Sequence, residues 1–341
     1  MQVPLPLARY RRDVDAFLKS FLQRDSVAQL TRMTRYHMGW ENEQGRPADS
    51  AGKGLRPSLL LLACEAVGGD WRRAVPAAAA LELVHNFSLI HDDIQDRDTE
   101  RHHRPTVWSI WGEAQAINAG DALLALARLA LLRLHDEGLS PETTLQAARL
   151  LDERTLEMVE GQVMDLEFEQ ASDVGLDDYM VMIGKKTGAL FDGSLAVGAL
   201  VGGGDPETAQ TFGRAGRLLG MAFQVRDDML GIWGAETRTG KRPAADIRRR
   251  KKSLPIVYAL NSGDHAAVAC INRAYAADDL SEEDVSVILR SLDAINGQGY
   301  CVAQAEKHKS EALDLIAVLP LDEVRVAEFR ETADFLLERD F

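Results

Sequence analysis

The sequence has few aromatic residues and few cysteines. Phe, Trp and Tyr make up 6% of the 341 residues, whereas alanine and leucine recur throughout. This composition favours helices over sheets, because strands are enriched in aromatic and β-branched side chains. The three cysteines, Cys64, Cys270 and Cys301, lie far apart and form no CxxC pair. We therefore expect reduced, buried thiols, as in a cytoplasmic protein.

Basic charge and long apolar runs are also scarce. The chain has 39 Lys and Arg against 53 Asp and Glu, so its formal net charge is −14. Such an acidic protein is not expected to bind nucleic acid or an anionic membrane surface non-specifically. The apolar stretch from Ala122 to Leu132 is interrupted by Arg128, and the first residues lack the apolar core of a signal peptide. The sequence predicts a cytoplasmic protein without stable membrane insertion.

The hydrophobic pattern is helical along the chain. Residues 14–22 place their apolar side chains on one helix face, and residues 59–67 and 77–94 are apolar all round, as buried helices are. Ser140 and Ser281 stand where helix N-caps are expected. No segment shows clean strand alternation, and no linker rich in Pro, Gly or Ser divides the chain. We predict an all-α fold, with a single domain over residues 1–341.

Aspartates form two clusters, each after an apolar helix. Asp92, Asp93 and Asp96 follow the run LELVHNFSLIH, and Asp227 and Asp228 follow an Ala/Gly/Leu-rich segment. Like charges one helical turn apart repel each other, so each cluster needs a compensating charge. Mg²⁺ suits such sites, because it binds a few carboxylates together with water and phosphate oxygens. If the two helices face each other, the cavity between them has an acidic mouth and an apolar floor. Such a cavity suits a molecule with a diphosphate head and a hydrocarbon tail.

Basic residues accompany both acidic clusters. Lys53 and Arg56 lie in the Gly-containing segment AGKGLRP, where backbone amides and two cations suit a phosphate. Residues 101–104 (RHHR) follow the first cluster, and a basic segment from Lys241 to Lys252 follows the second. On spacing alone, an ordinary loop with surface charges is the favoured interpretation of Lys53 and Arg56, and the last segment is compatible with a solvated basic turn or a nucleic-acid patch. A Mg²⁺–diphosphate complex requires both signs of charge nearby, which favours a binding role.

From about Gly52 to the C-terminal helices, these motifs resemble those of the trans-isoprenyl diphosphate synthases (polyprenyl synthetases). The resemblance implies an isoprenoid synthase helical bundle around a central cavity, assembled as a homodimer. It implies condensation of isopentenyl diphosphate with an allylic diphosphate, with Mg²⁺ as the cofactor and Mn²⁺ as an alternative.

The resemblance also implies a role for each matching position. Metal binding is implied for Asp92, Asp93, Asp96, Asp227 and Asp228, with Asp92, Asp96 and Asp227 as the direct ligands. Substrate binding is implied for Lys53, Arg56, His85, Arg101, His102, Lys186, Thr187, Gln224, Lys241 and Lys251. The implied catalytic set is Asp92, Asp96, Asp227, Lys186, Arg101 and Gln224. Gln162 and Asp165 match a GQxxD element of the family.

Three positions depart from the family pattern. His102 replaces the second Arg of the usual Arg-Arg pair, and Ser253 replaces a usual Thr. Gly231 stands where the second motif usually ends in Asp, so that motif has two carboxylates instead of three. Ser253 preserves the hydroxyl, whereas the departures at His102 and Gly231 bear on turnover and metal affinity. They keep a non-catalytic partner subunit open as an alternative. A class I terpene cyclase is the other alternative, although it would need no isopentenyl diphosphate site.

Product length is expected to depend on the helix before Asp92. The small Ser88 and the bulky Phe87 precede an aspartate motif that contains no insertion. The resemblance implies that an aromatic residue at this position, with no insertion in the motif, is typical of one type of geranylgeranyl diphosphate synthase. Phe87 lies roughly 140° around an ideal helix from Asp92, so it borders the tunnel only if the helix rotates or the tunnel curves. Farnesyl diphosphate is the alternative product.

Overall fold

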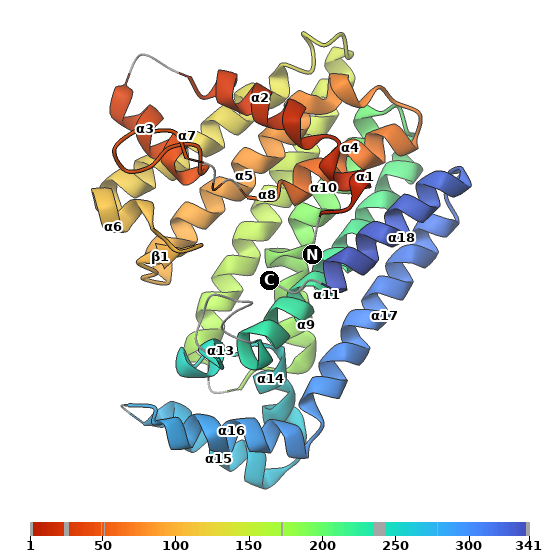
Figure 1. The fold of residues 1–341 in the computed structure, drawn as a ribbon. Helices are drawn as coiled ribbons and strands as arrows, with labels where there is room; N and C mark the ends of the chain where they lie inside the picture. Colours follow the sequence, from red (N-terminus) through yellow and green to blue (C-terminus); the bar gives the residue numbers. More distant parts are fainter. Residues whose placement is uncertain are drawn as a thin grey trace.

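The computed structural model describes residues 3–23, 27–48, 50, 52–171, 173–234, 243–277 and 279–338. The fold is a bundle of helices, as the sequence predicts (Figure 1). Within these residues, the strands are the two-residue β1 (Glu100–Arg101) and β2 (Arg104–Pro105), which pair antiparallel. His102 and His103 form the turn between them, and both have positive φ, as tight hairpin turns require.

The helices follow one another with short connections. Their bounds are α1 (Leu5–Ala8), α2 (Arg11–Phe21), α3 (Ala28–His37), α4 (Leu55–Ala66), the 3₁₀ helix η1 (Trp71–Ala74), α5 (Val75–Gln95), α6 (Val107–Trp111), α7 (Glu113–Leu132), α8 (Pro141–Gln170), α9 (Leu176–Lys186), α10 (Gly188–Val201), α11 (Pro206–Trp233), α13 (Ala245–Arg248), α14 (Leu254–Asn261), α15 (His265–Ala276), α16 (Glu282–Ala294), α17 (Gly297–Ala317) and α18 (Glu323–Glu338).

Local sequence explains where several helices begin. The Ser140 hydroxyl accepts a hydrogen bond from the Thr143 amide at 3.0 Å, and α8 starts at the proline that follows. Ser281 and Asp284 form a capping box at α16. Both N-caps were predicted from the sequence. The three cysteines are free and buried, which confirms the expectation for them.

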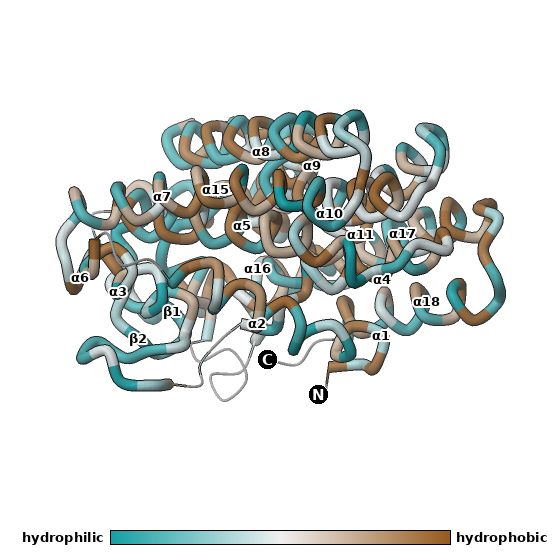
Figure 2. The backbone as a smooth tube through the Cα atoms, turned by 90° about the horizontal axis from the view of Figure 1, so that it is seen from above, coloured by the Kyte–Doolittle hydropathy of each residue, from teal (hydrophilic) through white to brown (hydrophobic). Residues whose placement is uncertain are grey.

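Helix α10 lies at the centre of the bundle and is buried along most of its length. It packs against α4, α8 and α11, and Figure 2 shows it between α8 and α4. Glycines allow the backbone of α10 to lie close to the backbones of α4 and α11. A Cβ at Gly198 would lie 2.1 Å from the Leu60 carbonyl oxygen, and one at Gly216 would lie 2.4 Å from that of Phe191. This packing holds α10 and α11 in fixed register, so side chains on α11 have a defined position relative to α10.

The two helices that carry the aspartate clusters end differently. Helix α5 ends at Gln95, directly after Asp92 and Asp93, as expected. Helix α11 continues past Asp227 and Asp228 to Trp233, whereas the sequence suggested an end at the aspartate pair. The second pair therefore lies inside a helix, and Gly231 lies on the next turn.

A second, smaller core lies at the other end of the molecule. It is formed by buried side chains of α13 to α16 together with Ile232 of α11, and α15 and α16 lie at the bottom of Figure 1. Helices α17 and α18 run along the side of α11. The end of α11 thus joins the main core to the smaller one.

Helix α7 corrects one expectation from the sequence. Its residues Glu113–Leu132 are long and apolar enough, by length and composition alone, to span a membrane, even though Arg128 lies within them. The sequence had suggested that no apolar run reaches that length. In this fold, α7 packs along α5 and against α8, and 44% of its most apolar 18-residue segment is buried. Core helices have the same composition.

Candidate active site

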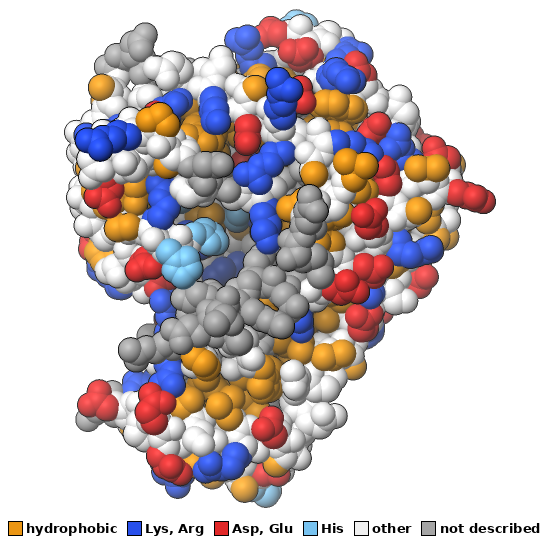
Figure 3. Space-filling view, in the orientation of Figure 1, with side chains coloured by type: hydrophobic (Ala, Val, Ile, Leu, Met, Phe, Trp, Pro, Cys, Tyr) orange, Lys and Arg blue, Asp and Glu red, His pale blue; other side chains and the backbone are white. Residues whose placement is uncertain are grey.

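A cavity of about 310 Å³ lies between α4, α5, α8, α9, α10 and α11. Figure 3 shows Lys, Arg and His side chains around a hollow on one face of the molecule. The cavity brings together side chains that are far apart in sequence. The predicted site residues that line it are Arg56, His85, Phe87, Ser88, Asp92, Arg101, Gln162, Asp165, Lys186, Thr187, Gln224, Asp227 and Lys251.

The three carboxylates of the first aspartate cluster have different surroundings. Asp92 lines the cavity, and Asp96 is exposed at the end of α5. Burial raises the pKa of Asp92, an effect that Lys186 opposes and Asp96 reinforces. Asp93 is only 2% exposed and does not line the cavity. Its carboxylate instead accepts a hydrogen bond from the Nε of Arg101 at 2.6 Å. Asp93 therefore orients Arg101 and does not face the cavity.

The two carboxylates of the second cluster also have different surroundings. Asp227 is exposed and lines the cavity, whereas Asp228 is 1% exposed. The carboxylate of Asp228 accepts hydrogen bonds from the Tyr179 hydroxyl, from the Leu254 amide at 3.1 Å and from Gln224 Nε2 at 3.0 Å. Both of its oxygens are therefore engaged within the protein. No pattern in the sequence indicated Tyr179, which lines the cavity from α9.

Arg56 and His85 lie next to each other in the lining of the cavity. The Nη1 of Arg56 lies 3.1 Å from the Nε2 of His85, and its guanidinium stacks over the ring of Phe191 at 5.0 Å. Burial lowers the pKa of Arg56 to about 10 although Glu82 raises it, so the guanidinium stays charged at neutral pH. Burial and the neighbouring Arg56 lower the pKa of His85 well below 6.5, so this imidazole is uncharged at neutral pH.

Two predicted substrate-binding residues that the structure describes do not line the cavity. Lys53 is exposed in the segment before α4, and His102 is exposed in the hairpin turn between β1 and β2. Lys241 lies outside the described residues.

Polar contacts also join the helices that carry other lining residues. The Nζ of Lys186 lies 2.5 Å from Oδ2 of Asp165, which links α9 to α8. The Thr187 hydroxyl donates to Gln224 Oε1 at 2.7 Å, which links the start of α10 to α11. Burial lowers the pKa of Lys251, but the carboxylates of Asp246, Asp228 and Asp165 raise it by more, so this lysine is charged at neutral pH.

Apolar side chains also line the cavity, some of them from α5. Phe87 and Ser88 both line it, although Phe87 lies roughly 140° around an ideal helix from Asp92. The Phe87 ring meets the His91 ring edge-on, with centroids 5.6 Å apart. Sequence reasoning did not single out the remaining apolar lining residues, Leu89, Met158, Val159, Met182, Ile183 and Leu190.

The acidic groups suit a hard divalent cation. In the part of the chain that the structure describes, no three His, Cys, Asp or Glu side chains converge into a ready-made metal cage. Asp92 and Asp227 reach the cavity from different helices, with basic residues around them. Mg²⁺ fits such a donor set, because it takes many of its ligands from water and phosphate oxygens.

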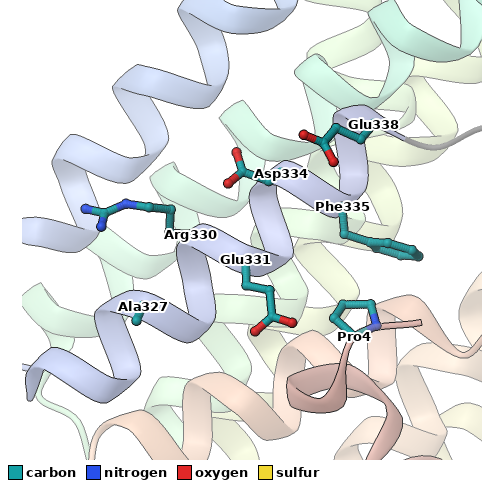
Figure 4. A pocket seen from close by; sticks show the side chains of 7 residues that line it. All are labelled: Pro4, Ala327, Arg330, Glu331, Asp334, Phe335 and Glu338. Carbon is teal, nitrogen blue, oxygen red and sulfur yellow. The ribbon is translucent and has the colours of Figure 1, made fainter. Parts of the chain in front are cut away.

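A second hollow lies against α18 and the N-terminal segment (Figure 4). It is lined by Pro4, Ala327, Arg330, Glu331, Asp334, Phe335 and Glu338. No residue predicted as part of the site lies there. Three carboxylates and one guanidinium do not suit a diphosphate, so the cavity at α5 and α11 is the candidate active site.

Residues 46–292 match the polyprenyl synthetase family. The chain belongs to this family. It is 39% identical over 308 residues to the (2E,6E)-farnesyl diphosphate synthase of Mycobacterium tuberculosis, covering 89% of this chain and 84% of that protein. It is 40% identical over 314 residues to the geranylgeranyl diphosphate synthase of the same organism, covering 91% and 87% of the two chains.

Solved structures agree with this assignment. The crystal structure of polyprenyl synthetase from Streptomyces coelicolor A3(2) superposes with a TM-score of 0.92 at 37% identity, over 98% of this chain and all of that one. This polyprenyl synthetase is therefore a chain-elongating prenyl diphosphate synthase, which uses an allylic diphosphate and isopentenyl diphosphate.

Proposed function

We propose that this polyprenyl synthetase is a Mg²⁺-dependent geranylgeranyl diphosphate synthase, with Mn²⁺ as an alternative cation. The observation that carries the proposal is the composition of one cavity. Asp92 and Asp227 line it together with basic side chains, and Phe87 and Ser88 line it along α5. A diphosphate head fits the charged part, and a growing hydrocarbon chain fits the apolar part.

The proposed roles follow from the position of each residue. Asp92, Asp96 and Asp227 hold the cation, which when bound neutralises charge on the diphosphate leaving group. Arg101, Lys186 and Lys251 supply further positive charge to the departing pyrophosphate. Asp93 and Asp228 act through their neighbours, because their oxygens are used in hydrogen bonds within the protein.

The proposed reaction needs no protein nucleophile. The C–O bond of the allylic diphosphate breaks, and its electron pair leaves with pyrophosphate. The double bond of isopentenyl diphosphate then attacks the allylic cation and forms the new C–C bond. Loss of a proton to the departing pyrophosphate restores a double bond. Arg56 and His85 hold isopentenyl diphosphate from inside the cavity, with Lys53 and His102 contributing from the surface segments. Thr187 and Gln224 lie beside the reacting carbons.

The product assignment rests on the residues below the metal site. The small Ser88 leaves space in the cavity, and Phe87 limits it further along α5. We propose that the chain stops growing at twenty carbons when it meets the Phe87 ring. Farnesyl diphosphate is the second candidate, because one of the relatives above is a farnesyl diphosphate synthase.

We further propose a cytoplasmic homodimer joined through α7 and α8. These helices carry a group of exposed apolar side chains: Ile117, Leu129, Leu132, Leu145, Leu156, Val159 and Val163. Exposed apolar surface of this kind is typical of subunit interfaces. A second copy of the same chain is the occupant that the family resemblance implies.

One assay tests the activity and the product together. Purified protein is given Mg²⁺, isopentenyl diphosphate and either dimethylallyl, geranyl or farnesyl diphosphate, and the products are identified by mass. We expect geranylgeranyl diphosphate from all three starters and no turnover in excess EDTA. Accumulation of farnesyl diphosphate without further extension would show that farnesyl diphosphate is the main product. An absence of turnover from the pure chain would favour a partner subunit.

A further inference from the structure

His91 lies directly before the first aspartate cluster and lines the same cavity as Phe87. It follows Phe87 by four residues on α5, and residues at this spacing are neighbours on the surface of a helix. The two rings meet edge-on, with centroids 5.6 Å apart and an angle of 88° between their planes. The imidazole of His91 is thus in direct contact with the ring that limits the cavity along α5.

The imidazole also lies against the backbone of α7. A Cβ placed on Gly120 would lie 2.3 Å from Nε2 of His91, 2.5 Å from its Cδ2 and 3.2 Å from its Cε1. The ring therefore occupies the space that a side chain at position 120 would fill. Gly120 is buried where α7 packs along α5. The absence of a side chain at Gly120 is what allows the ring to lie there.

Two polar atoms of α7 lie near the same ring. The Nε2 of His91 is 3.4 Å from the carbonyl oxygen of Ile117 and 3.7 Å from Oδ1 of Asp121. The side chain of His91 is 26% exposed, so most of it is enclosed by these neighbours. The contacts with Ile117, Gly120 and Asp121 keep the imidazole on one turn of α7.

This arrangement restricts the movement of Phe87. Its ring is only 6% exposed, and a helical backbone already limits an aromatic side chain to two χ1 rotamers. The imidazole fills the space beside the ring and is itself backed by the main chain of α7 at Gly120. A ring that a growing hydrocarbon chain meets ends the elongation sharply only if it cannot move aside.

We propose that His91 is a positioning residue for product length: its imidazole, held against α7 at Gly120, keeps the Phe87 ring in place and so fixes where elongation stops. The proposal rests on the proposed function, because the ring of Phe87 limits chain growth there. The shape of the imidazole carries this role, and its charge is not needed. Product length is then decided by two packed helices, α5 and α7.

The first test replaces His91 and identifies the products by mass. Purified full-length protein is given Mg²⁺, isopentenyl diphosphate and farnesyl diphosphate. We expect His91→Ala to lengthen the main product by one five-carbon unit, because the Phe87 ring can move into the vacated space. His91→Phe keeps a ring in that place and should retain the product of the wild type. A general loss of turnover lowers all products together and does not shift their lengths.

A second test reaches the same ring from α7. Gly120→Ala places a methyl group where the imidazole lies, so the ring is displaced and the main product should again lengthen. In the His91→Ala background the methyl group has room, so Gly120→Ala should add no further change. Gly184→Ala is the control, because a Cβ there meets the sulfur of Met221 at 3.6 Å, an ordinary contact. These variants decide the question even if His91→Ala does not fold.

Two results would overturn the proposal. One is the wild-type product from both His91→Ala and Gly120→Ala, and the other is equal lengthening by His91→Phe and His91→Ala. Failure of the proposed function is a different result, because Phe87→Ala would then yield the product of the wild type. If Phe87→Ala lengthens the product, His91→Ala added to it should cause no further change.

Discussion

The Nε of Arg101 lies 2.6 Å from Oδ1 of Asp93, a carboxylate that is turned away from the cavity it adjoins. Arg101 itself lines that cavity. Asp93 is therefore placed to hold the guanidinium in position, while its neighbour Asp92 faces the cavity directly. Removing one partner of a buried ion pair leaves the other without compensation.

This pair predicts different effects for the two adjacent aspartates. We expect Asp93→Asn to raise the KM for the allylic diphosphate about 10-fold, which is the loss of one charge-assisted hydrogen bond of roughly 1.5 kcal/mol. We expect Asp92→Asn instead to lower kcat and to raise the Mg²⁺ concentration needed for half-maximal rate. Steady-state kinetics at varied Mg²⁺ would measure both. An equal shift in Mg²⁺ requirement for the two variants would contradict this division of roles.

Asp227 and Asp228 should differ in their effect on stability. Asp228→Asn places an amide NH₂ among the three donors that surround the carboxylate, so we expect unfolding to become easier by about 1–3 kcal/mol. Asp227→Asn alters an exposed side chain, so we expect a change within about 0.5 kcal/mol together with a large loss of turnover. Urea denaturation followed by circular dichroism, with parallel kinetics, would test this. The prediction fails if Asp227→Asn is the more destabilising change.

The residues along α5 should set the product length. We expect Phe87→Ala to extend the main product beyond twenty carbons, because it opens the apolar end of the cavity. We expect Ser88→Phe to shorten it to farnesyl diphosphate, because a ring then fills the space closer to Asp92. Mass analysis of the products gives the answer. If Phe87→Ala yields the same product as the wild type, another residue limits chain growth.

The proposed interface on α7 and α8 predicts a change of oligomeric state. Light scattering at micromolar concentration should give a dimer for the wild type. Leu156→Glu with Val163→Glu places two charges among exposed apolar side chains of α8 and should give a monomer. Val318→Glu changes an equally apolar, exposed residue after α17 and serves as the control. A monomeric wild type would exclude the interface.

His308 predicts a dependence of stability on pH. It is 8% exposed on α17, and burial lowers its pKa below 6.5 although Glu311, 3.8 Å away, raises it. The unfolded chain therefore takes up this proton more readily than the folded protein. The contribution of neutral His308 to stability is complete above pH 6.5 and is lost as the pH falls below that value.

The matching experiment is urea denaturation at pH 7.5, 6.0 and 5.0. We expect His308→Gln to reduce the loss of stability on acidification by up to about 1.4 kcal/mol per pH unit, which corresponds to one proton. His265 is exposed, so His265→Gln is the control and should follow the wild type. An identical pH dependence in His308→Gln and the wild type would rule out this role.

The sequence by itself determined the helical content, the all-round burial of α5 and the start of α8 at Ser140, because each of these depends on residues close together in the chain. It also located both aspartate clusters and the basic segments near them. The cavity brings Asp92, Asp227 and Lys186 together as the motifs suggested.

Only the tertiary structure decided which carboxylates face the cavity. Successive residues of a helix point about 100° apart, so Asp92 and Asp93 cannot face the same way, and spacing alone does not say which one faces inward. A hydrogen bond from Arg101 holds the carboxylate of Asp93 away from the cavity, and hydrogen bonds from Tyr179 and Leu254 hold that of Asp228. All three donors come from other segments of the chain. The placement of the His91 ring against Gly120 likewise depends on how α7 packs against α5, which no local pattern records.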